Sequence, residues 1–287
     1  MHLLWKITGK MTGFSAAGVL FAKRSGLRYN GNRTEERFVA MKNNYRMLVA
    51  YDGSRFYGWA AQPDQEMTIQ GKLESVLSKM TESEVEVIGA GRTDAGVHAR
   101  GMVANVHLDT SMTDVQIRDY LNHYLPDDIC VLEVKKAAER FHARYNARGK
   151  TYRYAIYAGP LKPLFQRKYV YECFDAPDVD RMREAAQYLL GTHDFAGFSH
   201  NPRMKKSTVR TVDSIEIEKK GDYIYFTYHG DGFLQYMVRI LTGTLIEVGQ
   251  GKREPESMKE LLEKKDRSLA GFTAPAKGLT LMKVDYM

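Results

Sequence analysis

Apolar and polar positions alternate with two different periods along the chain after residue 44, and this predicts a mixture of helices and strands. In two segments the apolar residues recur every three or four positions, so that they line one face of a helix. One stripe consists of Ile69, Leu73, Val76, Leu77 and Met80, and the other of Ile117, Tyr120, Leu121, Tyr124 and Leu125. The first half of the chain therefore predicts a strand at 45–51, a helix at 68–80, strands at 85–89 and 101–108, a helix at 114–125 and a strand at 129–136.

The same order of elements returns in the second half. Here the pattern predicts a strand at 151–157, a helix at 178–190, strands at 211–219 and 223–229, a helix at 233–248 and a strand at 280–286, with an additional helix near 256–265. Two tandem βαββαβ units are typical of the ferredoxin-like, RRM-like fold of the α+β class. We expect one domain at 45–150 and another at 151–287. Together they would form one extended, mixed, mainly antiparallel sheet with helices on one face, an open second face and a cleft between the halves.

The positive charge of the chain is concentrated at its beginning. The formal net charge is +7, and residues 1–44 carry eight lysines and arginines against two glutamates, a net of +6. This segment has no strong apolar period, and we expect a disordered leader, with Met41 as the true start of the protein. The remainder is almost neutral, so only the local basic clusters at 135–153 and 203–210 point to nucleic acid. A solvated surface explains either cluster equally well.

The cysteine content and the hydropathy of the chain indicate the cellular compartment in which the protein works. Cys130 and Cys173 stand alone, without the paired spacing of a zinc or redox site, and isolated cysteines are typical of the reducing cytoplasm. No apolar run approaches the roughly 20 residues that a membrane helix needs. We therefore expect a cytoplasmic protein that does not associate with membranes.

The glycine-rich segment "GAGRTDAGVHARG" at 89–101 is the first candidate for chemistry. It connects two predicted strands, so Asp94 is expected at the tip of a hairpin, between Arg92 and Arg100. The segment does not match the GxGxxG dinucleotide motif, because Asp94 occupies the sixth position. A metal site would need Asp94 together with His98 and His107, but the flanking arginines repel a cation, and we expect no metal. An aspartate that only closes a turn remains the plain alternative.

An arginine far along the chain favours a role for Asp94 in chemistry. In "FLQYMVRILTGTLIEV" at 233–248, Arg239 is the only charged residue before Glu247. An arginine in such an apolar helix is costly unless a carboxylate meets it, and Asp94 is the obvious partner. Burial alone raises a carboxyl pKa by about 3 to 5 units, and an adjacent arginine lowers it by about 1 to 3 units. With Arg239 close, we expect Asp94 to stay ionised and to act as a nucleophile or charge stabiliser.

Aromatic residues follow the basic linker in "KTYRYAIY" at 150–157. In a strand, Tyr152 and Tyr154 share one face and Arg153 points to the other. Core packing is the ordinary role of such tyrosines. Beside a basic cluster, however, a tyrosine is also suited to stack on a nucleobase.

Taken together, these motifs resemble the bacterial tRNA pseudouridine synthase A family, and the likeness runs from about Tyr45 to Tyr286. The segment "GRTDAGVHA" (91–99) resembles the catalytic loop of that family. The supporting segments are "YDGSRFYGWAAQ" (51–62), "TIQGKLE" (68–74), "FHARYNARGKTYRY" (141–154), "FLQYMVR" (233–239) and "KGLTLMKVDY" (277–286).

The resemblance implies a role for each matching residue. Asp94 would be the nucleophile that attacks the target uridine, Tyr152 would stack on the uracil, and Arg239 would pair with the catalytic carboxylate. Arg92 would hold the place of the flipped-out nucleotide in the stem, and Leu279 would line the pocket. Within the basic clusters, we expect tRNA contacts from Lys150, Arg153, Arg203, Lys205 and Lys206.

The resemblance also implies a reaction and its partners. The N1–C1′ bond of uridine breaks, the uracil rotates, and it is rejoined through C5, without a metal or an organic cofactor. The substrates would be uridines 38, 39 and 40 of the tRNA anticodon stem-loop, and the protein would be a homodimer across which one tRNA extends. The residues leave open whether the carboxylate adds to C1′, adds to the ring or removes a ribose proton. The alternative function is a non-catalytic RNA-binding protein built on the same double sheet.

Overall fold

A computed structural model of the chain describes residues 42–200 and 206–287. Most of the predicted leader, including Met41, lies outside this range, as do Arg203 and Lys205. The first strand begins at Asn43, two residues earlier than predicted. The reason is Asn44, which is buried and whose side-chain amide donates to the carbonyls of Ala138, Glu139 and Phe141.

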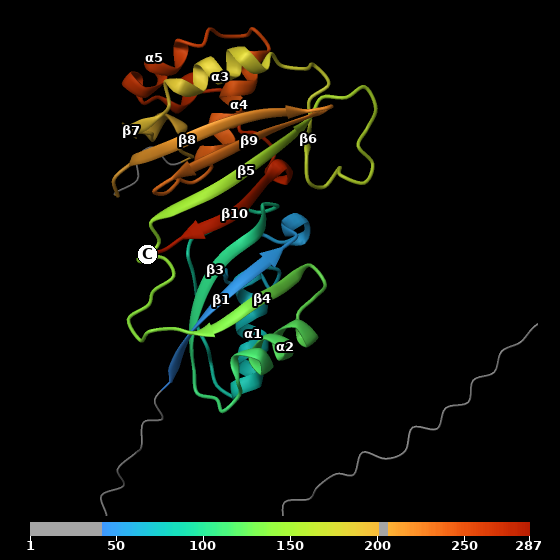
Figure 1. Ribbon diagram of the computed structural model, residues 1–287, viewed down its shortest axis with the longest axis vertical. Helices are drawn as coiled ribbons and strands as arrows, with labels where there is room; N and C mark the ends of the chain where they lie inside the picture. The colour runs from blue at the N-terminus through green and yellow to red at the C-terminus, as the bar shows by residue number, and fades with distance from the viewer. Residues whose placement is uncertain (1–41, 201–205) are drawn as a thin grey trace, which may run out of the picture. The chain divides into compact units, whose positions relative to one another are not determined.

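The described residues form one sheet of ten strands (Figure 1). The strands are β1 (Asn43–Tyr51), β2 (Val87–Gly89), β3 (His98–Leu108), β4 (Ile129–Lys136), β5 (Gly149–Tyr157), β6 (Tyr171–Glu172), β7 (Gly191–Asp194), β8 (Val209–Lys220), β9 (Tyr223–Gly230) and β10 (Leu279–Asp285). The helices are α1 (Ile69–Thr81), α2 (Asp114–Tyr124), α3 (Val179–Gln187), α4 (Met237–Gly249) and α5 (Ser257–Lys264). The main path of the sheet is β4-β1-β3-β10-β5-β9-β8-β7.

The two halves of the chain repeat one strand order, which confirms the predicted pair of βαββαβ units. The first half runs β4-β1-β3-β2, and the second half runs β10-β5-β9-β8. The pairs β3–β10 and β5–β6 are parallel and the other ladders antiparallel, so the sheet is mixed and mainly antiparallel, as expected. The short strands β6 and β7 were not predicted, because segments of this length show no recognisable period.

The halves are joined because two strands share one edge of β3. Strand β2 pairs with residues 104–106 of β3, and β10 pairs with His98 and Ala99 at its other end. Gly101 makes the approach possible, since a Cβ atom at this position would lie 2.4 Å from the carbonyl oxygen of Met282. The ribbon shows β3 and β10 side by side where the two halves meet (Figure 1). The loop that precedes β3 is thereby held against the second half.

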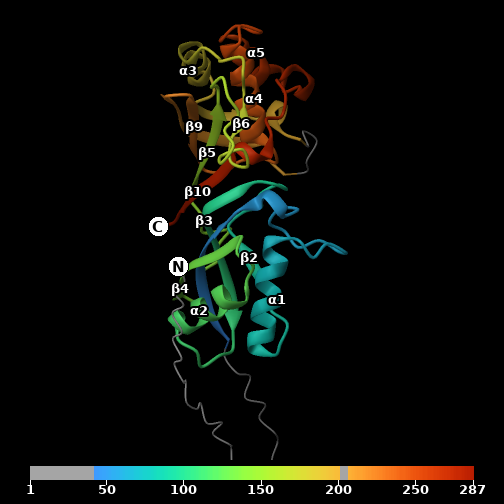
Figure 2. The same ribbon diagram turned by 90° about the vertical axis from the view of Figure 1, so that its right-hand side faces the viewer.

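Helices α1, α2, α3 and α4 each pack against a strand of their own half of the chain (Figure 2). Thr113 caps α2 in a capping box with Gln116. Helix α4 begins at Met237, four residues later than predicted, because Tyr236 is left-handed with φ +63° and stops the helix there. Arg239 therefore lies in the first turn of α4. In the described part of the chain, no helix is long and apolar enough to span a bilayer.

The face of the sheet away from α4 is partly covered, which differs from the open face that we expected. Ala155 and Tyr157 of β5 form a small apolar cluster with Val170, and Tyr223 and Tyr225 of β9 pack against it. The connection between β5 and β6 supplies Val170, and nothing in its sequence pattern distinguishes it from an exposed loop. An uninterrupted floor for nucleic acid is therefore not present on this face.

Candidate active site

The loop between β2 and β3 carries Asp94 at a tight turn. The amide of Val97 donates to the carbonyl of Asp94 at 3.1 Å, and the amide of Gly96 donates to the carbonyl of Phe56 at 3.2 Å. Gly96 has φ +77°, a conformation that glycine adopts without strain. Because β2 and β3 are paired antiparallel neighbours, the prediction that Asp94 lies at the tip of a hairpin connection is confirmed.

The segment that precedes α1 supports the residue next to Asp94. The amide of Trp59 donates to the carbonyl of Thr93 at 3.0 Å, and the hydroxyls of Thr93 and Tyr51 share a hydrogen bond of 2.8 Å. Gly58 has φ +98°, and a Cβ atom there would lie 2.6 Å from the Thr93 carbonyl oxygen. Position 58 therefore requires glycine, and the loop is fixed on both sides.

Arg239 reaches the carboxylate of Asp94 from the second half of the chain. Its Nη1 lies 3.3 Å from Oδ2 of Asp94, and the two side chains are only 14% and 19% exposed. Its Nε donates to the carbonyl of Ala274 at 2.7 Å, and its guanidinium carbon lies 4.8 Å from the ring centroid of Tyr236. The prediction that this arginine meets Asp94 is confirmed.

The pKa of Asp94 corrects one step of the sequence argument. We expected Arg239 to outweigh burial and to keep this pKa low. Instead, burial raises the pKa of Asp94 above its ordinary value, and the charges of Arg239 and His200 only oppose the rise. A single contact of 3.3 Å at one oxygen does not replace the water that burial removes. Asp94 is therefore more basic than an exposed aspartate.

A cleft of about 670 Å³ opens beside Asp94 and is lined by both halves of the chain. Tyr152 and Leu279 enter it from β5 and from the beginning of β10. The ring of Tyr152 packs edge-on against Phe233, with centroids 5.4 Å apart. Burial, with the charge of Asp94 as a smaller cause, raises the pKa of Tyr152 well above its usual range. The side chain therefore stays neutral at physiological pH.

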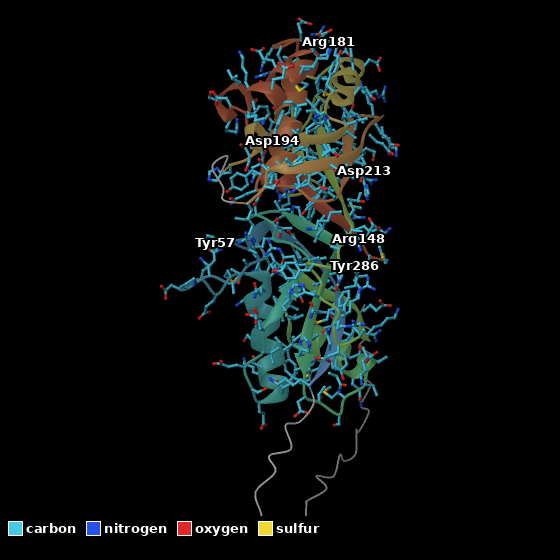
Figure 3. The ribbon with its side chains drawn as sticks, turned by 90° about the vertical axis from the view of Figure 1, so that its left-hand side faces the viewer. Tyr57, Arg148, Arg181, Asp194, Asp213 and Tyr286 are labelled. Carbon is cyan, nitrogen blue, oxygen red and sulfur yellow. The ribbon has the colours of Figure 1, made fainter. Side chains whose placement is uncertain are left out.

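The neighbouring tyrosine of the same strand has a different role. Tyr154 is fully buried, and its hydroxyl donates to the carbonyl of Pro275 at 2.7 Å. It is a core residue, which is the ordinary role that we weighed for both tyrosines. Tyr57, in contrast, is 57% exposed and lines the cleft, and Figure 3 shows it on the first half of the chain, near the junction with the second. The sequence analysis did not single it out.

The basic residues that we expected at the tRNA do not all lie together. Arg92 and Lys150 line the cleft with Asp94. Arg153 lies on the opposite face of β5, where it contacts Thr227 at 3.4 Å and lines a separate cavity of about 620 Å³. Lys206 is exposed next to the undescribed residues 201–205.

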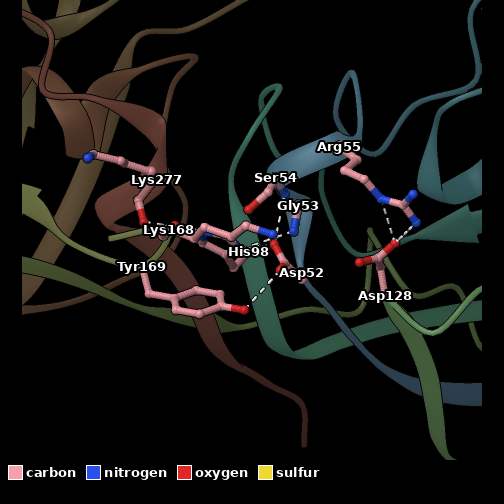
Figure 4. Close-up of polar contacts among 9 residues, drawn as sticks. All are labelled: Asp52, Gly53, Ser54, Arg55, His98, Asp128, Lys168, Tyr169 and Lys277. Carbon is pink, nitrogen blue, oxygen red and sulfur yellow. Dashed lines mark hydrogen bonds and ion pairs between the residues drawn. The ribbon is translucent and has the colours of Figure 1, made fainter. Parts of the chain in front are cut away.

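The three residues of the metal alternative do not converge. His98 turns away from the cleft: its Nδ1 accepts from the amide of Gly53 at 3.0 Å, and its Nε2 lies 3.1 Å from the carbonyl oxygen of Lys168 (Figure 4). His107 pairs with Glu139 instead, at 3.4 Å. Within residues 42–200 and 206–287, no group of three histidine, cysteine or carboxylate side chains could hold a metal ion.

The network around His98 also contains Asp52, for which no role was predicted. The carboxylate of Asp52 accepts from the amide of Ser54 and from the hydroxyl of Tyr169, each at 2.9 Å. It lies 3.2 Å from Nδ1 of His98. These residues are up to 117 positions apart, and no local pattern in the sequence marks them as neighbours.

Similarity to known sequences extends over most of the chain. The family model for tRNA pseudouridine synthases matches residues 47–146 and 185–287. The tRNA pseudouridine synthase A of Bacillus sp. (strain KSM-64) is 48% identical over 85% of this chain and all of its own length. The corresponding protein of Brevibacillus brevis is 46% identical over 84% of this chain and 98% of its own length. The tRNA pseudouridine synthase A 2 of Clostridium tetani is 43% identical over 86% of this chain and all of its own length.

Solved structures show a weaker likeness. A Cbf5-Nop10-Gar1 complex is 12% identical, with a TM-score of 0.34 over 83% of this chain and 48% of that chain. This is too low to assign the fold, which rests on the strand order itself. The family match and the sequence identities, however, are sufficient. The chain belongs to the tRNA pseudouridine synthase family, and it is an isomerase that makes pseudouridine in tRNA.

Proposed function

We propose that this enzyme isomerises uridines 38, 39 and 40 of the tRNA anticodon stem-loop, with Asp94 as the nucleophile. One observation carries the assignment of Asp94: its carboxylate is paired with Arg239 inside a cleft large enough for a nucleotide. A non-catalytic RNA-binding protein would have no use for a buried ion pair at this place. The substrate positions rest on the resemblance of the motifs to the family.

The geometry gives each residue a step in the reaction. Arg239 orients the carboxylate of Asp94 and stabilises its charge, and its bonds to Ala274 and its contact with Tyr236 keep the guanidinium in place. Burial makes the carboxylate more basic and removes competing water, and both effects strengthen a nucleophile. The ring of Tyr152 stacks on the uracil, and Leu279 supplies an apolar wall for the nucleotide.

The overall change is an isomerisation that needs no oxidant and no reductant. The N1–C1′ bond breaks, a C5–C1′ bond forms after the uracil rotates, the hydrogen at C5 leaves as a proton, and N1 gains a proton. The proton gained at N1 replaces the hydrogen lost from C5, so the composition of the nucleotide is unchanged. The residues of the cleft supply the nucleophile, the stacking surface and the charge that this sequence requires, and we propose that no cofactor takes part.

A uridine within a stem must be extruded before it can react. Leaving the stack costs a few kcal/mol, and contacts between the protein and the RNA backbone have to offset this cost. Arg92 is exposed at the edge of the cleft, where its side chain takes the place of the extruded nucleotide in the stem. We further propose that the enzyme acts in the cytoplasm as a homodimer across which one tRNA extends.

The release of tritium from tRNA labelled at C5 of uridine tests this function. The native chain should release tritium, and Asp94→Asn should lower the rate by at least about a thousandfold, because removing a nucleophile removes the covalent step. Asp109→Asn is the matched control: this aspartate is exposed at the end of β3 and should leave the rate unchanged. Undiminished release by Asp94→Asn would contradict the proposal for Asp94, and mapping the pseudouridines in the product tests positions 38–40.

A further inference from the structure

Lys150 is a cation of the cleft for which the described part of the chain provides no carboxylate partner. It is half-buried at the beginning of β5 and lines the cleft together with Asp94. Its Nζ comes so close to the catalytic loop that a Cβ atom on Gly91 would lie 3.1 Å from it. In the described part of the chain Lys150 takes part in no ion pair, although many other lysines do.

The charges that face Lys150 come from several elements and are mainly positive. Arg144 lies on the segment before β5, Arg210 on β8 and Asp231 after β9. Arg92 lines the same cleft from the catalytic loop. Burial, followed by the repulsion of Arg144 and Arg210, lowers the pKa of Lys150 to about 8, and Asp231 only partly opposes this.

A buried ammonium group without a counterion is costly, and a folded protein retains it where a ligand supplies the missing negative charge. The anion has to be one that arrives with the substrate, since Lys150 opens into the substrate cleft. A nucleotide that enters the cleft brings its flanking phosphodiesters with it. Arg144 lines the cleft beside Lys150 and offers a second cation to the same group.

We propose that Lys150 and Arg144 form a phosphate subsite, which binds the RNA backbone next to the uridine that has entered the cleft. This inference rests on the proposed function, because it takes the occupant of the cleft to be an extruded nucleotide. The bound phosphate supplies the ion-pair partner that Lys150 lacks in the free protein. It thereby holds the backbone of the extruded nucleotide close to the loop that carries Asp94.

The salt dependence of tRNA binding tests the subsite. Binding is measured with the full chain carrying Asp94→Asn, so that the tRNA stays unmodified. At pH 7, adding Lys150→Met should weaken binding about three- to tenfold at low salt and should reduce the slope of log K against log salt by about one, as expected for one lost phosphate contact. Lys150→Arg should preserve both values.

Lys219→Met is the matched control. Lys219 is exposed on β8, and the strand register aligns Lys150 with Gly230 and Gly230 with Val212. Val212 is therefore the residue of β8 that is level with Lys150. Lys219 lies seven residues further along β8, a distance of about 23 Å. Lys219→Met should leave the slope unchanged, and an equal loss in both variants would overturn the assignment to Lys150.

The pH dependence gives an independent readout. With Lys150 in place, affinity should fall as the pH rises from 7 to 9, because the free protein loses the Lys150 proton near pH 8. Lys150→Arg should remove this fall, since a guanidinium stays charged over the whole range. A fall of the same size in Lys150→Arg, or an unchanged salt slope in Lys150→Met, would overturn the subsite.

Two measurements distinguish failure of the phosphate subsite from unfolding of the variant and from failure of the proposed function. The melting temperature of Lys150→Met at pH 7 should be at least that of the parent chain, because the variant removes a charge that is costly to bury, so weaker binding cannot be attributed to unfolding. Tritium release by the native chain tests the proposed function by itself. Release with unchanged binding by Lys150→Met rejects only the subsite, whereas absence of release rejects the proposed function.

Discussion

Asp94 and Asp52 line two separate cavities, and the pKa values of their carboxyl groups are shifted in opposite directions. Burial acts to raise the pKa of both carboxyl groups. At Asp52 the hydrogen bonds from Ser54 and Tyr169, with the charge of His98, outweigh burial and lower the pKa. At Asp94 the contact with Arg239 does not outweigh it, and the pKa is raised.

The difference supports the proposal that Asp94 is the reactive carboxylate. Asp52 accepts at 2.9 Å from two donors and is fully engaged in joining segments of the chain. Among the described residues, the carboxylate of Asp94 accepts one hydrogen bond, from Arg239 at 3.3 Å, and it opens into the cleft. A carboxylate with many close donors is stabilised in its resting state and is a poor nucleophile, whereas one that is less well solvated retains its basicity. The ion pair with Arg239 therefore holds Asp94 in position without neutralising its reactivity.

Removing Arg239 should have the largest effect on the reactivity that we propose for Asp94. Arg239→Met should lower the rate of tritium release by about a hundred- to a thousandfold, the loss typical of removing one preorganised charge donor. It should also raise the pKa of Asp94 further, since the charge that opposes burial is gone. If ionised Asp94 is required, activity rises with pH through that pKa, and the rising limb of the pH profile should move to higher pH in the variant. An unshifted limb would show that Asp94 is not the titrating group.

Stability should depend more strongly on Asp52 than on Asp94. Asp52→Ala removes the cap of the short 3-10 helix η1 (Gly53–Arg55) and the bond from Tyr169, and it should lower the free energy of unfolding by about 1 to 2 kcal/mol. Asp94→Asn should lower it by less at pH 8, because a raised pKa means that the ionised form costs stability above that pKa, and removing this cost offsets part of the loss of the contact with Arg239.

Denaturant titrations of both variants at pH 8 and at a pH below the ordinary aspartate pKa of about 3.9 measure this difference. The contribution of Asp52 is present above its ordinary pKa and should fade as the pH falls through its lowered folded pKa. Equal destabilisation by Asp52→Ala and Asp94→Asn at pH 8 would remove the distinction between a structural and a reactive carboxylate.

Much of the architecture was predictable because it depends on local periods. The stripe of α1 and the capping box of α2 are visible in short windows of sequence, and both elements lie where we predicted them. The start of α4 was not, because the left-handed conformation of Tyr236 is set by tertiary contacts and not by a glycine. Burial of Val170 against β5 was missed for a similar reason.

The candidate site, too, was predictable only in part. The pairing of Asp94 with Arg239 was predictable because a lone charge in an apolar helix requires a partner, even 145 residues away. The direction of the pKa of Asp94 was not, because it depends on the balance between burial and a single contact distance. The links among Asp52, His98 and Tyr169 join three segments that have no shared period, and only the fold brings them together.

His98 lies beside Asp52 and also contacts the segment that leads to the cleft wall, so it links the surroundings of Asp52 to the cleft. Its Nδ1 accepts from the amide of Gly53, so the neutral ring carries its proton on Nε2 and donates toward the carbonyls of Lys168 and Lys277. Lys277 lies just before Leu279, which lines the cleft. His98 thus helps to set the position of that wall relative to the loop of Asp94.

The pH dependence of stability should report this role of His98. Burial lowers the pKa of His98 in spite of the nearby charge of Asp52. The unfolded chain therefore binds a proton below the ordinary histidine pKa of about 6.5 while the folded chain does not, and stability should fall by at most about 1.4 kcal/mol per pH unit as the pH decreases from there toward the folded pKa. His98→Gln should be less stable at pH 8 and should lose this part of the slope between pH 6.5 and 5. An unchanged slope would place the titrating group elsewhere, and unchanged stability at pH 8 would mean that the cleft wall does not depend on His98.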